Sequence, residues 1–307
     1  MNIILFGSSD ITLSIANFLY TNKYNLVAIV TVSQIFDISY NSNGVNNVRF
    51  VDLKIWGLNN NVPVFLYENV ESTIDFLRNF TLDFAIVAGW YHMIPSNLRN
   101  LFSKGCVGFH ASLLPQLRGG APLNWAILLG LPETGVSFFE FGNGVDDGLL
   151  YAQKKIPILP NDYIGDLVEK SKMAILDILK ITLPKIKKNQ IKKYKQIGNS
   201  SYCGQRFPED SLINWRDSAF NILALIRASS KPYHGAFSFL NDEKIVIWKA
   251  EISKFQLHGI PGQIIVVDGN VCTICGEKSL IIKPDITQVD LLIRSNHKRF
   301  KNSHYSS

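Results

Sequence analysis

His110 and Asp146 are the residues of this 307-residue chain whose types and positions best suit proton transfer. His110 closes a short apolar run and leads into a loop with the sequence SLLPQLRGG, while Asp146 follows an apolar segment that ends at Phe141. A histidine that titrates near neutral pH can accept a proton, and a nearby carboxylate can orient the ring and stabilise its charged form. We expect the two side chains to meet at one rim of a sheet. A half-buried imidazole and a capped turn are the alternative interpretation.

The segments around this pair alternate between apolar runs typical of strands and amphipathic stretches typical of helices. The chain opens with a strand, Ile3 to Phe6, a helix whose apolar residues recur from Ile11 to Leu19, and a second strand, Leu26 to Val32. This order predicts an α/β fold with a doubly wound, mostly parallel sheet. Gly7 lacks the further glycines of a dinucleotide fingerprint, so no nicotinamide cofactor is expected. Further strands are predicted at 62–66, 83–88, 135–141 and 149–158, and helices at 70–80, 123–129 and 162–184, the last ended by Pro184.

Beyond residue 200 the pattern changes to short strands with one helix, at 215–229. We therefore predict two domains, residues 1–200 and a smaller one at 201–307. The strands of the second domain are expected at 237–239, 245–248, 264–267, 271–274 and 280–282, an arrangement typical of a small barrel. The last stretch, from Thr287 onward, ends in HKRFKNSHYSS, and we expect it to be a frayed basic tail.

A set of spaced motifs between residues 110 and 148 resembles the signature of folate-dependent formyltransferases, which act on methionyl-tRNA, aminosugars or glycinamide ribonucleotide. A match at many spaced positions is far more specific than one short motif. The segment Gln205 to Asp210 is more similar to the aminosugar branch than to the tRNA branch. The motif residues are His110-x-Ser112-Leu113-Leu114-Pro115, Arg118-Gly119, Ala121-Pro122, Trp125, Thr134-Gly135-Val136 and Asp146-x-Gly148.

This resemblance implies a Rossmann-like formyltransferase domain followed by a barrel-like domain of OB type, with 10-formyltetrahydrofolate as formyl donor and no metal. It implies that His110 transfers the proton and that Asp146 orients His110 or an intervening water. For Trp90 and Tyr91 core packing is an equal alternative, and for Arg118 a loop-bracing role competes with ligand binding. The implied folate-binding residues are Ala88, Gly89, Trp90, Tyr91, Met93, Gly144 and Val145, and the implied substrate-binding residues are Ser112, Leu114, Arg118 and Gly119.

The chain departs from the family pattern two residues before His110. The family usually has an asparagine there that donates to the oxyanion of the tetrahedral intermediate, whereas this chain has Gly108. Losing such a donor typically costs about 10²–10³ in rate. We expect the glycine to leave room beside the reacting carbonyl, filled by a water or by part of the substrate, or compensated by a backbone N–H or protonated His110. An inactive homologue is the alternative.

A segment without lysine or arginine indicates which class of substrate carries the acceptor amine. Residues 33–47 are rich in asparagine and serine and are predicted as a loop, and no lysine or arginine occurs between Lys23 and Arg49. In formyltransferases of the tRNA branch, the corresponding loop is rich in lysine and arginine, because contacts to phosphate groups need cations. We therefore expect a nucleotide-linked aminosugar as substrate, in lipopolysaccharide or O-antigen biosynthesis, and no nucleic acid. Methionyl-tRNA, hydrolysis of the folate, and a non-catalytic folate- or nucleotide-binding homologue are the alternatives.

Composition limits the remaining classes. The net charge of +6 favours an anionic partner, and the basic run from Lys185 to Lys195 is either a solvated linker or an anion contact. Cys272 and Cys275 have no second pair of cysteines or nearby histidines, so they are interpreted as strand residues. No apolar stretch is long enough to span a membrane and the chain begins directly with a strand, so a cytoplasmic protein is expected. A homo-oligomer is compatible with this sequence.

Overall fold

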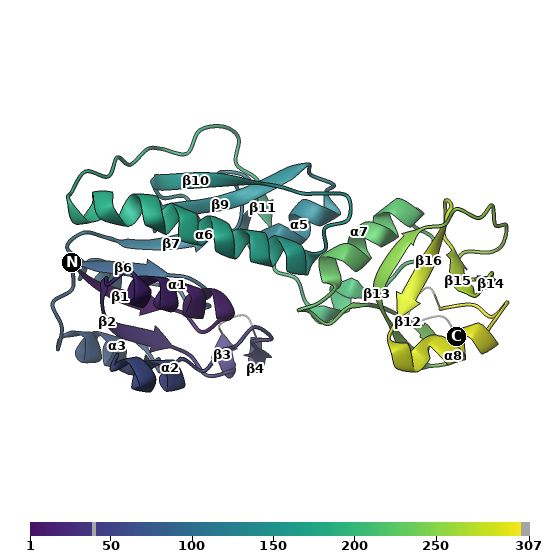
Figure 1. Cartoon of the computed structure of the whole chain (residues 1–307), viewed down its shortest axis with the longest axis horizontal. Coiled ribbons are helices and arrows are strands. Elements are labelled where there is room, and N and C mark those ends of the chain that lie inside the picture. The colour runs from purple at the N-terminus through teal and green to yellow at the C-terminus, as the bar shows by residue number, and fades with distance from the viewer. Residues whose placement is uncertain (39–40, 302–307) are drawn as a thin grey trace. The chain divides into compact units, whose positions relative to one another are not determined.

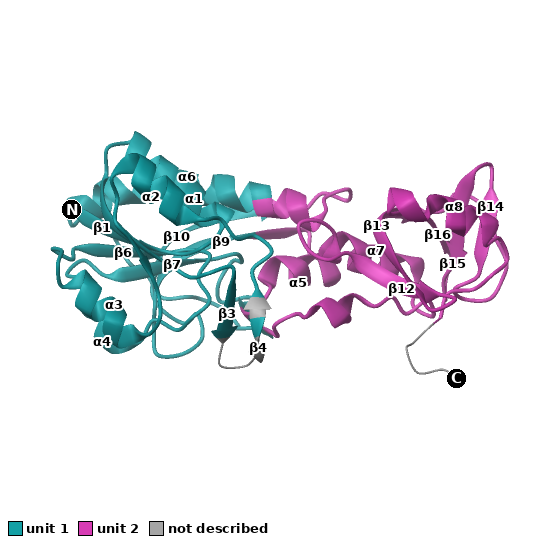
Figure 2. Cartoon of the chain, turned by 90° about the horizontal axis from the view of Figure 1, so that it is seen from below, with its two compact units in different colours: residues 1–118, 135–156, 169–202 teal, residues 119–134, 157–168, 203–307 magenta. Residues whose placement is uncertain are grey.

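The computed structural model describes residues 1–38 and 41–301, which form two compact units (Figures 1 and 2). Unit 1, drawn in teal in Figure 2, comprises residues 1–118, 135–156 and 169–202. Unit 2, drawn in magenta, comprises residues 119–134 and 157–168 and the chain from residue 203 onward. The chain therefore leaves unit 1 and returns to it twice before it completes unit 2.

A seven-stranded sheet forms the centre of unit 1, with the order β10-β9-β7-β6-β1-β2-β5. The neighbouring strands from β7 to β5 are parallel, whereas β9 is antiparallel to β7. This arrangement confirms the predicted mostly parallel α/β class. The strands are β1 (Asn2–Phe6), β2 (Asn25–Thr31), β5 (Val64–Leu66), β6 (Phe84–Val87), β7 (Cys106–His110), β9 (Glu133–Glu140) and β10 (Leu150–Pro157).

Helices cover both faces of this sheet (Figure 2). Ile4 and Phe6 of β1 face a core that includes Leu77 of α3 and Leu98 of α4, because alternate strand residues point to the same face. Side-chain caps start two of the helices: Asp52 accepts a hydrogen bond from the backbone of Lys54, and Asn69 accepts one from Ser72. The helices are α1 (Asp10–Thr21), α2 (Leu53–Asn60), α3 (Val70–Leu77), α4 (Ser96–Arg99) and α6 (Ile164–Lys187).

Helix α6 does not end at Pro184, as the sequence predicted, but continues to Lys187. A proline inside a helix lacks one N–H donor, which costs a single backbone hydrogen bond. Leu183 and Ile186 flank the proline and are buried at 0% and 2% exposure, so the apolar face continues past it. Burial of that face outweighs the loss of one hydrogen bond close to the helix end.

Residues 33–47 are not the irregular loop that their composition predicted. The described residues contain a two-stranded antiparallel hairpin, β3 (Ile35–Ile38) and β4 (Asn41–Asn46), in which Phe36 pairs with Val45. The Phe36 ring lies 4.9 Å from the Tyr91 ring. This aromatic contact anchors an otherwise polar segment, which is why counting asparagines and serines gave the wrong expectation.

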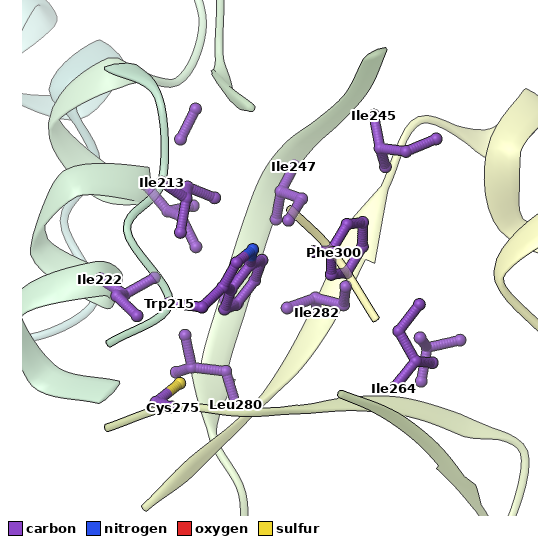
Figure 3. Packing of buried hydrophobic residues seen from close by; sticks show 14 of the residues in the cluster. Ile213, Trp215, Ile222, Ile245, Ile247, Ile264, Cys275, Leu280, Ile282 and Phe300 are labelled. Atoms are coloured by element: carbon purple, nitrogen blue, oxygen red, sulfur yellow. The ribbon is translucent and has the colours of Figure 1, made fainter. Parts of the chain in front are cut away.

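Unit 2 contains a five-stranded antiparallel sheet with the order β12-β13-β16-β15-β14, in agreement with the predicted barrel-like domain. Its core surrounds the fully buried Trp215, whose indole N–H donates to Ser238 Oγ at 2.9 Å (Figure 3). The elements of this unit are α5 (Pro122–Leu128), the short 3₁₀ turns Pro208–Ser211 and Ile286–Gln288, α7 (Ala219–Ser229), β12 (Ala236–Leu240), β13 (Glu243–Ile252), β14 (Ile264–Val267), β15 (Asn270–Ile274), β16 (Ser279–Pro284) and α8 (Val289–Arg294).

The C-terminal segment is ordered as far as residue 301, so the prediction of a frayed tail is wrong for these residues. The Phe300 side chain lies next to Trp215 in the core (Figure 3). The two rings stack with 5.1 Å between centroids, and Phe300 is 1% exposed. The backbone N–H of Phe300 donates to Gly262 and that of Lys301 donates to Phe239. One large apolar side chain in a basic stretch thus closes the core, while residues 302–307 lie outside the described part.

In the described ranges, no helix combines the length and apolar character needed to cross a membrane.

Candidate functional site

His110 lies at the end of β7, and the structure brings it next to Asp146. The distance from His110 Nδ1 to Asp146 Oδ2 is 3.4 Å. Both side chains are largely withdrawn from solvent, with exposed fractions of 9% and 19%. A low-dielectric position strengthens the interaction between an imidazolium and a carboxylate. The two residues that were predicted to act together therefore form one unit in space.

They do not meet at a shared sheet rim, as the sequence predicted. Because β9 runs antiparallel to β7, Glu140 at the end of β9 pairs with Val107 near the start of β7. The turn that follows β9, residues 141–148, instead folds back over β7 and carries Asp146 towards His110. The expected proximity is present, but it depends on this turn and not on parallel strand ends.

The 141–148 turn holds its two aspartates differently. Asp147 accepts a hydrogen bond from the backbone N–H of Gly144 at 3.0 Å, so its carboxylate belongs to the turn itself. Asp146 has a left-handed backbone with φ of 48°, which directs its carboxylate out of the turn. At Gly148 any Cβ would lie 1.6 Å from the carbonyl oxygen of Glu140, so only glycine fits there. The geometry selects Asp146 as the partner of His110.

The second ring nitrogen of His110 defines its tautomer. His110 Nε2 lies 2.6 Å from the backbone carbonyl oxygen of Leu117. A carbonyl oxygen only accepts hydrogen bonds, so Nε2 carries the proton and donates it. In the neutral ring Nδ1 is then the basic nitrogen, and it is the atom that faces Asp146. Proton uptake at Nδ1 creates an imidazolium whose positive charge lies 3.4 Å from a carboxylate oxygen, which stabilises it.

Leu117 takes part through its backbone, which no sequence motif could indicate. It has a left-handed φ of 55°, and its N–H donates to Ser201 Oγ at 2.9 Å. The next N–H, of Arg118, donates to the Ser201 carbonyl oxygen at 2.9 Å, within the short ladder between β8 (Arg118–Gly119) and β11 (Tyr202–Cys203). Ser201 therefore stabilises the backbone conformation that presents the Leu117 carbonyl to His110.

The expected space beside Gly108 is filled by the protein itself. A Cβ at Gly108 would lie 2.5 Å from Cζ of Phe141 and 3.1–3.2 Å from both Cε atoms of that ring. The expectation that a water or the substrate occupies this space is therefore wrong. Phe141 begins the turn that carries Asp146, so glycine at position 108 lets the turn approach the strand. The structure thus couples the missing asparagine to the placement of the partner carboxylate.

The predicted substrate-binding residues lie in the loop after His110. Ser112 and Leu114 are buried, and the Ser112 hydroxyl donates to the Gln116 carbonyl oxygen. Gly119 has a φ of 94° and lies in β8. The Arg118 guanidinium donates to the Gln196 side chain at 2.6 Å and to the Tyr202 hydroxyl at 3.1 Å. The loop-bracing role of Arg118 is thus visible, and ligand roles for these residues stay predictions.

The predicted folate-binding residues fall into two groups, one after β6 and one in the 141–148 turn. The Ala88 carbonyl oxygen accepts a hydrogen bond from Thr12, and that of Gly89 accepts one from the Ser8 backbone. Tyr91 donates its hydroxyl to Asn47 Oδ1 at 2.9 Å. Met93 and Val145 are exposed, at 80% and 56%. The backbone N–H of Gly144 donates to the Asp147 carboxylate within the turn.

Trp90 offers an observation that fits a ligand in this segment. Its indole ring packs edge-on against Phe6 and Tyr67, at 5.6 and 5.2 Å between centroids. Its Nε1–H is buried and has no hydrogen-bond partner among the residues that the structure describes. An unmet buried donor is costly unless something accepts from it. A folate ring system carries acceptor atoms, so the residues present are compatible with such a ligand.

His92 lies among aromatic rings next to this segment. Its ring centroid is 4.7 Å from that of Tyr67 and 5.5 Å from those of Phe36 and Trp90. Burial lowers the pKa of His92 below its ordinary value, because the charged form loses hydration. This environment favours a structural role for His92.

We expect the free energy of unfolding to fall as the pH decreases through about 6.5, the ordinary histidine pKa, because the unfolded chain binds a proton at His92 that the folded state resists. The stability is complete above this pH and declines until the lowered folded-state pKa is passed. His92→Phe should flatten this part of the curve, measured by chemical denaturation between pH 7 and pH 5. His258→Gln, at an exposed site, is the control. An unchanged curve in His92→Phe contradicts the prediction.

Three of the cysteines and one lysine of the basic run have structural roles. Burial raises the pKa of Cys106 and of Cys275 to about 12, so both are inert thiols. Cys272 is likewise buried in β15, as the sequence suggested. Within the basic run, Lys193 forms an ion pair with Glu140 at 3.0 Å, so at least this lysine serves the fold. Across the described ranges no cluster of three or more His, Cys, Asp or Glu residues is arranged to hold a metal.

Comparison with known proteins places this geometry in a family. The formyl transferase family model matches residues 64–179, and the model of the formyl transferase C-terminal domain matches residues 207–288. The chain is 35% identical over 253 residues to the bifunctional polymyxin resistance protein ArnA of Wigglesworthia glossinidia brevipalpis. That match covers 81% of this chain and 38% of ArnA, so the chain spans well under half of this relative.

Solved structures share the fold. The sugar 3N-formyltransferase WlaRD, in the presence of dTDP and 5-N-formyl-THF, has a TM-score of 0.67 at 20% identity and covers 93% of this chain and 98% of its own. An N-formyltransferase from Helicobacter canadensis, in complex with folinic acid and dTDP-3-aminofucose, has a TM-score of 0.66 at 20% identity, with 91% and 97% coverage. Methionyl-tRNA formyltransferase from Clostridium thermocellum has a TM-score of 0.59 at 17% identity, with 93% and 98% coverage.

The two family models together match more than half of the chain. The motif residues that suggested the resemblance include the histidine and aspartate that the structure brings to 3.4 Å. The chain belongs to the formyl transferase family, whose members are enzymes that transfer formyl groups.

Proposed function

We propose that this protein transfers a formyl group from 10-formyltetrahydrofolate to the amine of a nucleotide-linked aminosugar. The observation that carries the proposal is the buried His110–Asp146 pair, with the ring tautomer set by the Leu117 carbonyl. Such a pair offers a nitrogen that can accept a proton and a carboxylate that stabilises the protonated form, which amine formylation needs. Family membership supports formyl transfer as the reaction.

In the proposed reaction the amine nitrogen of the sugar forms a bond to the formyl carbon, and the formyl oxygen becomes a tetrahedral oxyanion. His110 Nδ1 accepts the proton that the amine loses, and Asp146 stabilises the imidazolium. The bond between the formyl carbon and N10 of the folate then breaks, and the proton passes from His110 to N10. The products are an N-formylated sugar and tetrahydrofolate. In this reaction His110 carries one proton from the amine to the folate, and Asp146 stabilises His110 while it is protonated.

The choice of an aminosugar is supported by sequence and by relatives. Between Lys23 and Arg49 there is no lysine or arginine, so the β3–β4 hairpin offers no cation for a tRNA backbone. The WlaRD and Helicobacter canadensis proteins were solved with dTDP or a dTDP-aminosugar. We further infer a cytoplasmic role in the supply of modified sugars for surface polysaccharide.

A non-catalytic folate- or nucleotide-binding role is the second candidate, and one observation favours it. Phe141 fills the space that a side-chain amide at position 108 would need, so the usual oxyanion donor is not merely missing but replaced by a phenyl ring. Under this interpretation the chain keeps the fold and the ligand pocket without appreciable turnover.

The deciding experiment incubates the protein with 10-formyltetrahydrofolate and a panel of dTDP- and UDP-aminosugars and then measures each sugar's mass. We expect one sugar to gain a single formyl group, and charged initiator tRNA to gain none. Any weak binding of tRNA should disappear at moderate salt, because it would depend on the exposed lysines of residues 185–195 and the tail. Efficient, salt-tolerant formylation of tRNA would refute the aminosugar assignment, and ligand binding without formylation would support the non-catalytic role.

A further inference from the structure

Gln196 connects the residues of the candidate site from a distant part of the chain. Its side chain makes four hydrogen bonds, two to the turn that carries Asp146 and two to Arg118. We propose that Gln196 is a positioning residue that holds Asp146 against His110 and orients Arg118 at the same time. The proposal rests on the proposed function for its kinetic consequences, and on geometry alone for its structural ones.

The amide nitrogen of Gln196 clamps the turn. Nε2 donates to the carbonyl oxygen of Asp146 at 2.7 Å and to that of Gly148 at 3.0 Å. Asp146 has a left-handed backbone, which an aspartate adopts only at a cost. A residue outside the turn that satisfies the carbonyls on both sides of Asp147 therefore stabilises the conformation that aims Asp146 at His110.

The amide oxygen of Gln196 orients Arg118. Oε1 accepts hydrogen bonds from Arg118 Nη2 at 2.6 Å and from Nε at 3.3 Å. A neutral acceptor directs a guanidinium without neutralising its charge, whereas a carboxylate would form an ion pair with it. Arg118 is thus held in a direction compatible with binding an anion in addition to its present contacts.

The backbone on both sides of Gln196 is attached to the same part of unit 1. Two residues earlier, Tyr194 exchanges two backbone hydrogen bonds with Leu150, at 2.8 and 3.0 Å. Five residues later, Ser201 binds Leu117 and Arg118. The segment has no helix or strand of its own between these attachments, so Gln196 is placed by them. Only an amide of this length supplies two donors and an acceptor at once.

Gln196→Met keeps the length and removes all four hydrogen bonds, and Gln196→Glu keeps an acceptor for Arg118 while removing both donors to the turn. We expect kcat for formyl transfer to fall in both, by up to about 100-fold, because small misplacements of reacting groups are that costly. Gln190→Met and Gln190→Glu, at an exposed position six residues earlier, are matched controls and should behave like the parent protein.

A spectroscopic measurement tests the proposal without any activity. The ¹⁵N shifts of the His110 ring should move in Gln196→Met and Gln196→Glu in the same direction as in Asp146→Asn, whereas the Gln190 variants should leave them unchanged. The Arg118 Nε–H signal should change in Gln196→Met and less in Gln196→Glu. His110 shifts that stay at the parent values overturn the proposal, even if Arg118 responds. Shifts that move in a protein without formyl transfer support the positioning role while refuting the proposed function.

Discussion

Replacing His110 with glutamine or asparagine should remove most formyl transfer while the protein still folds. The glutamine amide can reach the place of Nε2 and keep the hydrogen bond to the Leu117 carbonyl, but neither side chain has a nitrogen that can take a proton. Since positioned acid–base groups typically contribute about 10²–10⁴-fold, we expect kcat to fall within that range. Steady-state kinetics on the formylated sugar measures this, with circular dichroism to verify folding.

Asp146→Asn tests whether the two residues act as one unit. Its effect on kcat, combined with that of His110→Gln, should be far from additive, because removing either residue disables the same proton transfer. Asp147→Asn is the matched control: Asp147 is the neighbouring aspartate, and its carboxylate binds the Gly144 N–H within the turn. Near-parent turnover in His110→Gln would assign His110 a structural role, and strictly additive effects would separate it from Asp146.

The second large effect is expected at Gly108. Gly108→Asn places a Cβ 2.5 Å from the Phe141 ring, so the ring and its turn must shift. Overpacking of this kind typically costs about 1–3 kcal/mol of unfolding free energy. Gly108 lies in strand β7 and is not among the residues with a left-handed backbone, so the ring and not the backbone is the obstacle. Denaturant unfolding measures the loss, and kcat should fall because the turn also carries Asp146.

Shortening Phe141 should reduce the stability cost of Gly108→Asn. In a Phe141→Ala background, Gly108→Asn enters a space left by the ring and should cost less stability than in the parent. If the enzyme lacks only the oxyanion donor, the double variant should gain turnover over Phe141→Ala alone, by at most about 10²–10³-fold. A Gly108→Asn protein as stable as the parent would show that Phe141 does not block this position.

Local patterns were sufficient for most strands of the two sheets and for the residue types of the site. The alternation of apolar runs and amphipathic stretches predicted the parallel sheet, since strand and helix periodicity are properties of a few consecutive residues. The motif spacing between His110 and Asp146 indicated the family. Such patterns are properties of consecutive residues, and they placed both residues beside strands of one sheet without showing the turn that brings them together.

The tertiary structure alone decided the contacts that join distant segments. The fold-back of the 141–148 turn, the Phe141 ring over Gly108 and the Gln196 amide between Asp146 and Arg118 depend on side chains that no local pattern relates. Phe300 is the same case in unit 2, because a single phenylalanine in a basic stretch gives no periodic signal until its partner Trp215 is in place. Leu117 acts through a carbonyl that every residue possesses, so its role comes from backbone conformation and not from its identity. The sequence by itself determined which groups could transfer a proton, and the folded chain determined how they are held, because that depends on packing between residues far apart in sequence.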